Sequence, residues 1–263
     1  MEAKLLIGFC VAGAISLPAW RFRALDGWGA VAALAMGTIF FGLGGMFPSI
    51  ALVLFFVSGS ILSALPGKQK VLTGDESRGR SWKQVVANGF VATILILAAS
   101  IWTAHHNTLL IIAVASIAAA AADSWSTEIG TRYGGDARDI LSGKKVSAGV
   151  SGGVSLLGLV ASVCGGLFVA ASSIYLPEAS HVRMLLTITL SAILGAVCDS
   201  ILGSSVQAKY RCDVCGELTE SANHCGGHAL LVKGKELVDN NVVNFAATAI
   251  SAFFCAVVLD FLL

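Results

Sequence analysis

Long apolar runs separated by short polar connections repeat along the whole chain. A helix needs roughly 20 mostly apolar residues to cross a hydrocarbon core of about 30 Å. By this criterion the pattern predicts eight spanning helices, at 3–19, 28–44, 48–65, 85–103, 108–129, 150–174, 183–206 and 242–262. No long linker or low-complexity tract divides these runs. We therefore predict an all-α fold, with one polytopic transmembrane domain over residues 1–263 and a Cys/His-rich cytoplasmic loop at 207–238.

The composition agrees with lipid as the main solvent of this chain. Hydrophobic residues make up 56% of it and charged residues 13%, whereas a soluble domain carries about 25% charged residues. The mean hydropathy is +0.82. This apolar composition makes the bilayer the expected partner. A formal net charge of +1 gives no reason to expect a nucleic-acid partner.

Basic residues predict how the helices are oriented. Of the 17 Lys and Arg residues, only Lys4 and Arg183 fall outside the connections that follow the first, third, fifth and seventh predicted helices. By the positive-inside rule these four connections are cytoplasmic and both termini lie outside. The connections hold Arg21, Arg23, Lys68, Lys70, Arg78, Arg80, Lys83, Arg132, Arg138, Lys144, Lys145, Lys209, Arg211, Lys233 and Lys235.

Two carboxylates interrupt the apolar helices near their predicted cytoplasmic ends. Asp123 follows the alanine run 118–122, and Asp199 is followed by Ile201 and Leu202. At a rise of about 1.5 Å per residue, each lies roughly 7–10 Å inside the bilayer surface. An ionised carboxylate at that depth costs about 2.5–3.5 kcal/mol even on lenient insertion scales, so we expect both to face a cavity, a metal or a partner. The alternative is a structural hydrogen bond between helices.

Glu128 follows Asp123 by five residues, and this spacing separates the two carboxylates by roughly 140° around a straight helix. A continuous helix would therefore aim them in different directions. Either the helix ends near Ser126, which Gly130 makes plausible, or the two acids have different roles.

A second polar cluster combines two lysines with a loop rich in glycine and serine. Lys144 and Lys145 precede Ser151, Gly152 and Gly153, which we expect at the start of the sixth helix. Backbone N–H groups and the positive end of a helix would make this segment a cradle for an anion such as phosphate. A tight turn before the helix explains the same glycines, so both interpretations stay open.

Amide side chains gather where two returning helices begin. Asp239 and Asn240 open the last helix, Asn244 lies one turn further on, and Asn88 has the corresponding position in the fourth helix. Helix capping alone accounts for Asp239, but it leaves the amides unexplained. Carboxylates and amides around a basic anion cradle are the composition of a magnesium–phosphate site.

Three cysteines and two histidines crowd into the loop at 207–238. The spacing of Cys212, Cys215, His224, Cys225 and His228 is that of a zinc knuckle in a reducing compartment. Three thiolates and one imidazole would complete a tetrahedral site, with either His224 or His228 as the fourth ligand. We expect a structural role for this zinc ion.

These motifs together resemble those of an integral membrane family, known as a domain of unknown function, that includes the plastid phytyl-phosphate kinase of the vitamin E salvage pathway. The resemblance extends from about residue 25 to the C-terminus. The matching segments occur in the family's order, at 88–89, 122–130, 151–155, 199–203 and 239–244.

The resemblance implies transfer of the γ-phosphoryl group of a nucleotide, with CTP favoured, to phytyl or another isoprenyl monophosphate, which yields the diphosphate. It implies Mg²⁺ bound by carboxylates, namely Asp123, Glu128 and Asp199, with Asp239 as a further catalytic candidate. It implies phosphate binding or ligand orientation by Asn88, Lys144, Lys145, Ser151, Gly152, Gly153, Asn240 and Asn244. Because an acceptor phosphate is already ionised, positioning and charge neutralisation would suffice for catalysis.

Other classes stay open as alternatives. A nucleotide-dependent cytidylyltransferase would use the same metal and phosphate groups, and would release pyrophosphate rather than CDP. A transporter would place its buried acids near the midplane, whereas here the outer half of nearly every predicted helix is apolar. A scaffold would leave the cost of the buried acids unexplained. No plastid transit segment is apparent, so we expect a prokaryotic plasma membrane or a cyanobacterial membrane.

Overall fold

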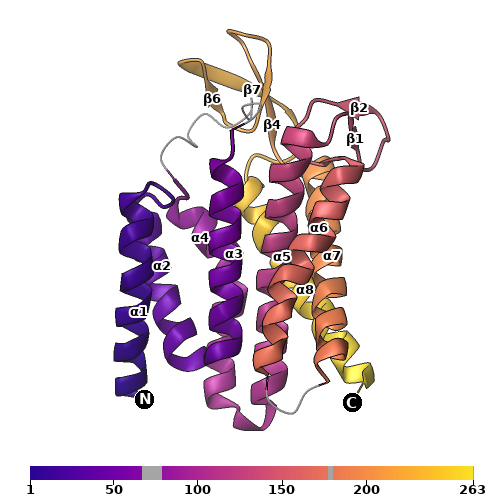
Figure 1. Ribbon diagram of the computed structural model, residues 1–263. Coiled ribbons are helices and arrows are strands. Elements are labelled where there is room, and N and C mark those ends of the chain that lie inside the picture. Colours follow the sequence, from indigo (N-terminus) through magenta and orange to yellow (C-terminus); the bar gives the residue numbers. More distant parts are fainter. Residues whose placement is uncertain (67–78, 177–179, 263) are drawn as a thin grey trace.

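The computed structural model describes residues 1–66, 79–176 and 180–262, and in these it contains eight helices long and apolar enough to cross a membrane (Figure 1). Their α-helical parts are α1 (Glu2–Arg21), α2 (Gly27–Ile39), α3 (Met46–Ala64), α4 (Trp82–Ile101), α5 (His106–Tyr133), α6 (Leu156–Ala170), α7 (His181–Ser205) and α8 (Asn240–Leu262). A π-helical turn, η1 (Phe40–Gly44), extends α2. The 3₁₀ turn η3 (Thr103–His105) precedes α5, and the 3₁₀ turn η4 (Ala171–Tyr175) follows α6. The predicted all-α membrane bundle is thus confirmed.

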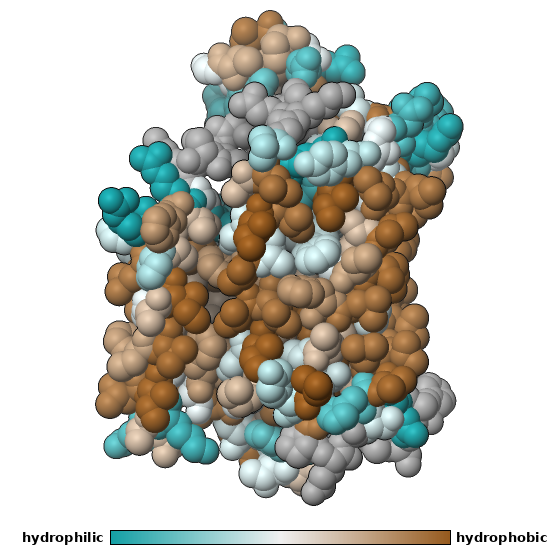
Figure 2. Space-filling model, in the orientation of Figure 1, coloured by the Kyte–Doolittle hydropathy of each residue, from teal (hydrophilic) through white to brown (hydrophobic). Residues whose placement is uncertain are grey.

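The surface of the bundle has the pattern expected of a protein immersed in a bilayer. Figure 2 shows a broad hydrophobic band around its middle, with hydrophilic residues concentrated toward the two ends. Large apolar side chains are exposed along this band, among them Leu6, Val57, Ile94, Leu190 and Phe253. In water such exposure would be a liability, but hydrocarbon is the favourable environment for these side chains.

Helix α5 lies at the centre of the bundle and packs against α3, α4, α6, α7 and α8 (Figure 1). Every residue from Leu110 to Ala122 is buried. Its alanines let neighbouring backbones come close, which is how helices associate when lipid removes the hydrophobic drive. A Cβ atom on Gly195 of α7, for example, would lie 2.8 Å from the Cβ of Ala119. Asp123 directly follows this run and is therefore placed among several helices.

Both chain termini lie at one end of the bundle, and the small sheets lie at the other (Figure 1). This arrangement agrees with an even number of crossings and with the predicted alternation of short and long connections. The inside-to-outside orientation stays a prediction from the basic residues. Of those residues, Lys68, Lys70 and Arg78 lie outside the described part of the chain.

The long connections fold into two small antiparallel sheets that the sequence did not predict. The connection between α5 and α6 forms a sheet of order β2-β1-β3, and the connection between α7 and α8 forms one of order β5-β4-β7-β6. In the first sheet, Arg138 pairs with both Lys145 and Val154. The strands are β1 (Ala137–Asp139), β2 (Lys145–Val146), β3 (Gly153–Val154), β4 (Lys209–Cys212), β5 (Leu218–Thr219), β6 (Asn223–His224) and β7 (Gly227–Lys233).

Two boundaries differ from the prediction. The sixth helix was expected from residue 150, but α6 begins at Leu156, after Ser155 accepts a hydrogen bond from the Gly158 N–H at 3.1 Å as its N-cap. The apolar valines before it belong to a turn and to β3, where Gly152 has a φ of +81° that a helix does not allow. The proposed early end of the fifth helix near Ser126 is wrong, because α5 continues to Tyr133.

Candidate functional site

A polar cavity of about 800 Å³ opens at the end of the bundle that carries the sheets. The C-terminal ends of α3, α5 and α7 surround it together with the first turns of α4 and α8 and the loop before α6. Its polar and charged lining includes Arg23, Ser60, Ser63, Arg80, Gln84, Asn88, Asp123, Ser124, Thr127, Glu128, Arg132, Ser151, Asp199, Ser200, Glu220, Asn240 and Asn244.

Most of the residues predicted for a site meet in this cavity, and three do not. Those that line it are Asn88, Asp123, Glu128, Ser151, Gly152, Gly153, Asp199, Asn240 and Asn244. Lys144, Lys145 and Asp239 are not among the lining residues. The convergence joins segments more than 150 residues apart, because antiparallel helices return each long connection to the same end.

Asp123 of α5 and Asp199 of α7 form the acidic centre of the cavity. Asp199 is close enough to Asp123 and Glu220 for their charges to interact. Its Oδ2 atom is buried and has no hydrogen-bond partner within the described residues. A buried carboxylate oxygen without a donor is costly, whereas carboxylate oxygens are the ligands that a hard cation such as Mg²⁺ prefers. The donor set therefore fits a magnesium ion.

Glu220 is the functional candidate that the sequence interpretation missed. It lies in the turn between β5 and β6, and the Ser151 hydroxyl donates a hydrogen bond to its Oε1. The Gln207 amide donates to Ser151 Oγ at 2.9 Å, and Lys209 Nζ donates to the Ser151 carbonyl oxygen at 2.7 Å. These contacts hold the Cys-rich sheet against the loop before α6. Nothing in the spacing of the acidic residues indicated that this one reaches the cavity.

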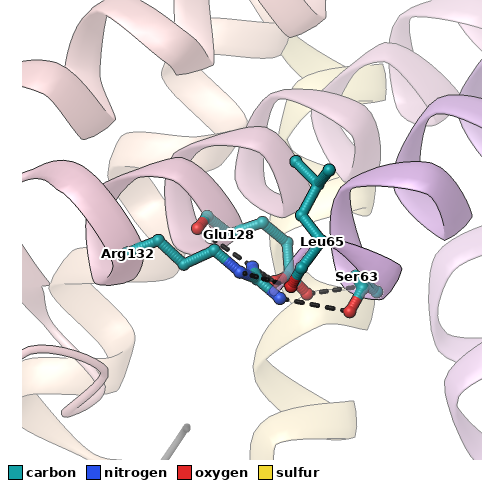
Figure 3. Close-up of polar contacts among 4 residues, drawn as sticks. All are labelled: Ser63, Leu65, Glu128 and Arg132. Carbon is teal, nitrogen blue, oxygen red and sulfur yellow. Dashed lines mark hydrogen bonds and ion pairs between the residues drawn. The ribbon is translucent and has the colours of Figure 1, made fainter. Parts of the chain in front are cut away.

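Glu128 makes a structural connection between α5 and α3 (Figure 3). The Ser63 hydroxyl donates to Glu128 Oε1 at 2.7 Å, and Arg132 Nη1 forms an ion pair with Oε2. Arg132 also donates to the carbonyl oxygens of Ser63, at 3.1 Å, and Leu65, at 3.2 Å. These carbonyls have no partner within the last turn of α3, where a cation is also favoured by the helix dipole. Glu128 is thus bound to α3 and Arg132, whereas Asp123 lies close enough to Asp199 for their charges to interact.

The glycine-rich loop packs tightly against α7. A Cβ atom on Gly152 would lie 2.5 Å from the Cβ of Ser204, so only glycine fits there. Ser204 donates a 2.5 Å hydrogen bond to Asp139 Oδ2, and this bond holds the pKa of Asp139 well below its ordinary value. The glycines are therefore required by a close turn, and the loop still presents Ser151 and Gly153 to the cavity.

The two predicted lysines and Asp239 make other contacts. Lys144 and Lys145 are exposed on the connection that contains β2, and Lys145 Nζ lies 2.7 Å from Asp136 Oδ2. Asp239 accepts a hydrogen bond from the Val242 N–H at 2.9 Å, which is the capping role that the sequence also allowed.

The cysteine cluster forms a compact set of four potential ligands. The ligand atoms of Cys212, Cys215, His224 and Cys225 all lie within 4.8 Å of one another. His228, on β7, is not part of this set, so His224 is the better candidate for the fourth ligand. Hydrogen bonds from the Cys215 backbone and from His224 lower the pKa of Cys212 to about 6, which favours the thiolate that zinc requires.

The chain is similar in sequence to a family of membrane proteins. The model of an integral membrane protein family, DUF92, matches residues 10–252. Protein PGR of Arabidopsis thaliana is 26% identical over 97% of this chain and 96% of its own length. An uncharacterized membrane protein of Methanocaldococcus jannaschii is 28% identical over 78% of this chain and 84% of its own length.

A relative in Synechocystis, also described as an uncharacterized membrane protein, is 25% identical over 80% of this chain and 81% of its own length. The relatives therefore include prokaryotic proteins that align along most of the chain. No solved structure matches the chain significantly.

Proposed function

The chain belongs to the integral membrane protein family DUF92, and from this premise we propose that it is a lipid-phosphate kinase. It transfers the γ-phosphoryl group of a nucleoside triphosphate, preferably CTP, to phytyl or another isoprenyl monophosphate. The observation that carries this proposal is a buried Asp199 oxygen that has no hydrogen-bond partner among the described residues. It lies near Asp123 and Glu220 in a large polar cavity at one end of the bundle.

In this proposal the carboxylates bind the metal ion and the amides orient the two substrates. Asp123 and Asp199, with Glu220 beside them, would hold Mg²⁺, which supplies positive charge against the phosphoryl oxygens. Asn88, Asn240 and Asn244 line the cavity from α4 and α8 and would orient the nucleotide and acceptor through their amides. Glu128 is not assigned to the metal here, because both of its carboxylate oxygens already have protein partners.

The reaction needs no strong base, since the attacking group is itself an anion. An oxygen of the acceptor monophosphate forms a bond to the γ-phosphorus, the bond from that phosphorus to the β–γ bridging oxygen breaks, and the nucleoside diphosphate leaves. The side chains that line the cavity would contribute by positioning the two phosphates and neutralising their charge. The lining arginines Arg23, Arg80 and Arg132 add positive charge to an otherwise acidic site.

The proposed location of the site agrees with where its substrates occur. The cavity lies at the end of the bundle opposite the termini. The positive-inside rule assigns this cavity end to the cytoplasm. A nucleotide would enter it from the water phase, while an isoprenyl chain would reach it from the bilayer.

A product assay on detergent-purified protein tests the proposal. With Mg²⁺, phytyl or geranylgeranyl monophosphate, and CTP, ATP or GTP in turn, we expect mass spectrometry to detect the isoprenyl diphosphate. Asp123→Asn and Asp199→Asn should each reduce its formation by a factor of about 100 or more. Asp136→Asn, an exposed aspartate paired with Lys145 outside the cavity, is the matched control. Folded protein without turnover for any nucleotide, or with full turnover in both cavity variants, would contradict the proposal.

A further inference from the structure

A second, apolar cavity lies between α1, α2, α3 and α4 and borders the polar one. Its walls include Ile15, Met36, Phe40, Leu52 and Phe56. Figure 2 shows a hollow in the hydrophobic band between the α1–α2 side of the molecule and α3. We call this cavity the apolar slot. Its volume is about 160 Å³. Its lining consists of apolar residues and glycines, except for Ser16 and three polar residues in or just before α4.

The three polar residues are shared by the two cavities. Arg80, Gln84 and Asn88 line the apolar slot and also line the polar cavity. Gln84 and Asn88 are one turn apart on α4 and so lie on the same face of the helix. The apolar slot therefore borders the proposed catalytic cavity at a cation and two amides.

Arg80 is held at this junction by its backbone. Its N–H donates to the Ala24 carbonyl oxygen at 3.0 Å, and its own carbonyl oxygen accepts from the Asp26 N–H at 3.1 Å. These bonds fix the segment before α4 against the segment between α1 and α2. The position of Arg80 thus depends little on its own side chain.

The guanidinium group of Arg80 lies against α3 at the rim of the apolar slot. Its Cζ atom lies 5.4 Å from the ring centroid of Phe55 and 5.8 Å from that of Phe56. Gly59 provides the space, because a Cβ atom there would collide with Arg80 Nη2. Burial lowers the pKa of this arginine, and the charge of Glu128 acts in the opposite direction. Within the described ranges the guanidinium has no hydrogen bond or ion pair, although it offers five donors.

We propose that the apolar slot receives the isoprenyl tail of the acceptor and that Arg80 binds its phosphate where the slot meets the polar cavity. This inference rests on the proposed function and names its acceptor site. A partly buried guanidinium whose donors are not used by any described residue fits a phosphate, which it recognises in a bidentate manner. The narrow, aromatic-lined slot fits one branched hydrocarbon chain better than the paired chains of a phospholipid. The phosphate would then lie beside the amide of Asn88 and face the acidic centre.

Photocrosslinking tests the site without requiring turnover. A geranylgeranyl monophosphate with a diazirine near its chain end, added without nucleotide, should label peptides of α2 and α3. Arg80→Met keeps an aliphatic stem of similar length and should weaken labelling by about 10- to 100-fold, the loss expected for a charge-assisted hydrogen-bonded contact. Arg80→Lys should recover part of it. Arg138→Met, which changes an exposed arginine outside both cavities, should label like the wild type.

A second variant tests the tail contact independently of the charge. Ala33→Trp places a large ring in the apolar slot and should abolish labelling by the geranylgeranyl probe, while dimethylallyl monophosphate still binds. In a kinase assay, Arg80→Met should raise KM for the acceptor and leave KM for the nucleotide unchanged. The melting temperature of each variant in detergent establishes that it is folded.

Two outcomes would overturn the proposal. The first is labelling confined to α6, α7 or α8. The second is labelling of α2 and α3 that phosphatidic acid vesicles compete away as effectively as phytyl monophosphate does. The second would identify a site for bilayer phospholipid. Arg80-dependent labelling in a protein without kinase activity would support the apolar slot and reject the proposed function. Kinase activity with labelling elsewhere would reject the slot alone.

Discussion

The carboxylates of the polar cavity differ in what surrounds them, although the sequence makes them look alike. Glu128 accepts a hydrogen bond from Ser63 and pairs with Arg132, and so connects two helices. Asp199 has a buried oxygen with no partner in the described chain. At the scale of single residues, the first therefore contributes to stability and the second is suited to a ligand.

This difference predicts opposite effects of two conservative substitutions. Glu128→Gln removes one charge of a largely buried ion pair and leaves Arg132 uncompensated, which should lower stability by about 3 kcal/mol. Asp199→Asn changes a buried carboxylate with one oxygen that no described residue contacts, so it should leave the melting temperature unchanged or raise it while abolishing transfer. Thermal unfolding in detergent, without Mg²⁺ or nucleotide, measures both effects. A fall in melting temperature for Asp199→Asn as large as that for Glu128→Gln would contradict the assignment.

Sequence reasoning singled out Asp123 and Asp199, but it did not single out several other charged residues that line the cavity. Asp123 and Asp199 were recognisable because a carboxylate inside an apolar helix is costly. Arg132, Arg80 and Glu220 were not, because each lies in a polar connection or at a helix end, where charged residues are ordinary. Their importance depends on which helix the connection packs against, and that information is not local.

At the scale of elements, the Cys-rich sheet acts as a support for Glu220. The four potential zinc ligands come from β4, β6 and the turns next to them. The turn between β5 and β6 carries Glu220 to Ser151 and the cavity. A zinc ion bound at the cysteine cluster would fix the two ends of this short segment, and so would hold Glu220 in place.

We therefore expect purified protein to contain about one zinc ion per chain. Cys215→Ser should lower that content, increase amide hydrogen exchange across residues 212–225, and reduce transfer several-fold without unfolding the helices. Cys164→Ser, at an exposed position of α6, is the matched control. Elemental analysis and hydrogen exchange make the measurement. Zinc-free protein with a rigid sheet and full activity would refute this role.

The elements themselves were predictable to different degrees. The spanning helices follow from the length of their apolar runs, which lipid makes nearly obligatory. The two small sheets were missed, because six of their seven strands have only two to four residues and so carry no clear periodicity. The start of α6 was predicted six residues too early, since Val150 and Val154 extend the apolar pattern although they belong to a turn and a strand.

At the scale of the whole molecule, the arrangement concentrates polar groups at one end of an otherwise apolar bundle. Eight crossings bring every long connection to the end opposite the termini (Figure 1). Connections distant in sequence can therefore build one cavity, while α1 to α4 enclose an apolar slot beside it. A water-soluble donor and a membrane-bound acceptor can approach such a site from different phases, which is what transfer to a lipid phosphate requires.

The central claim is that this cavity transfers the γ-phosphoryl group of a nucleotide to an isoprenyl monophosphate. The most direct measurement supplies CTP radiolabelled either at the γ- or at the α-phosphorus and follows the label into the lipid product. We predict that γ-label enters the isoprenyl diphosphate, that α-label remains in CDP, and that Asp199→Asn transfers neither. Lipid that acquires the α-label, with release of pyrophosphate, would show cytidylyl transfer instead and would contradict the kinase assignment.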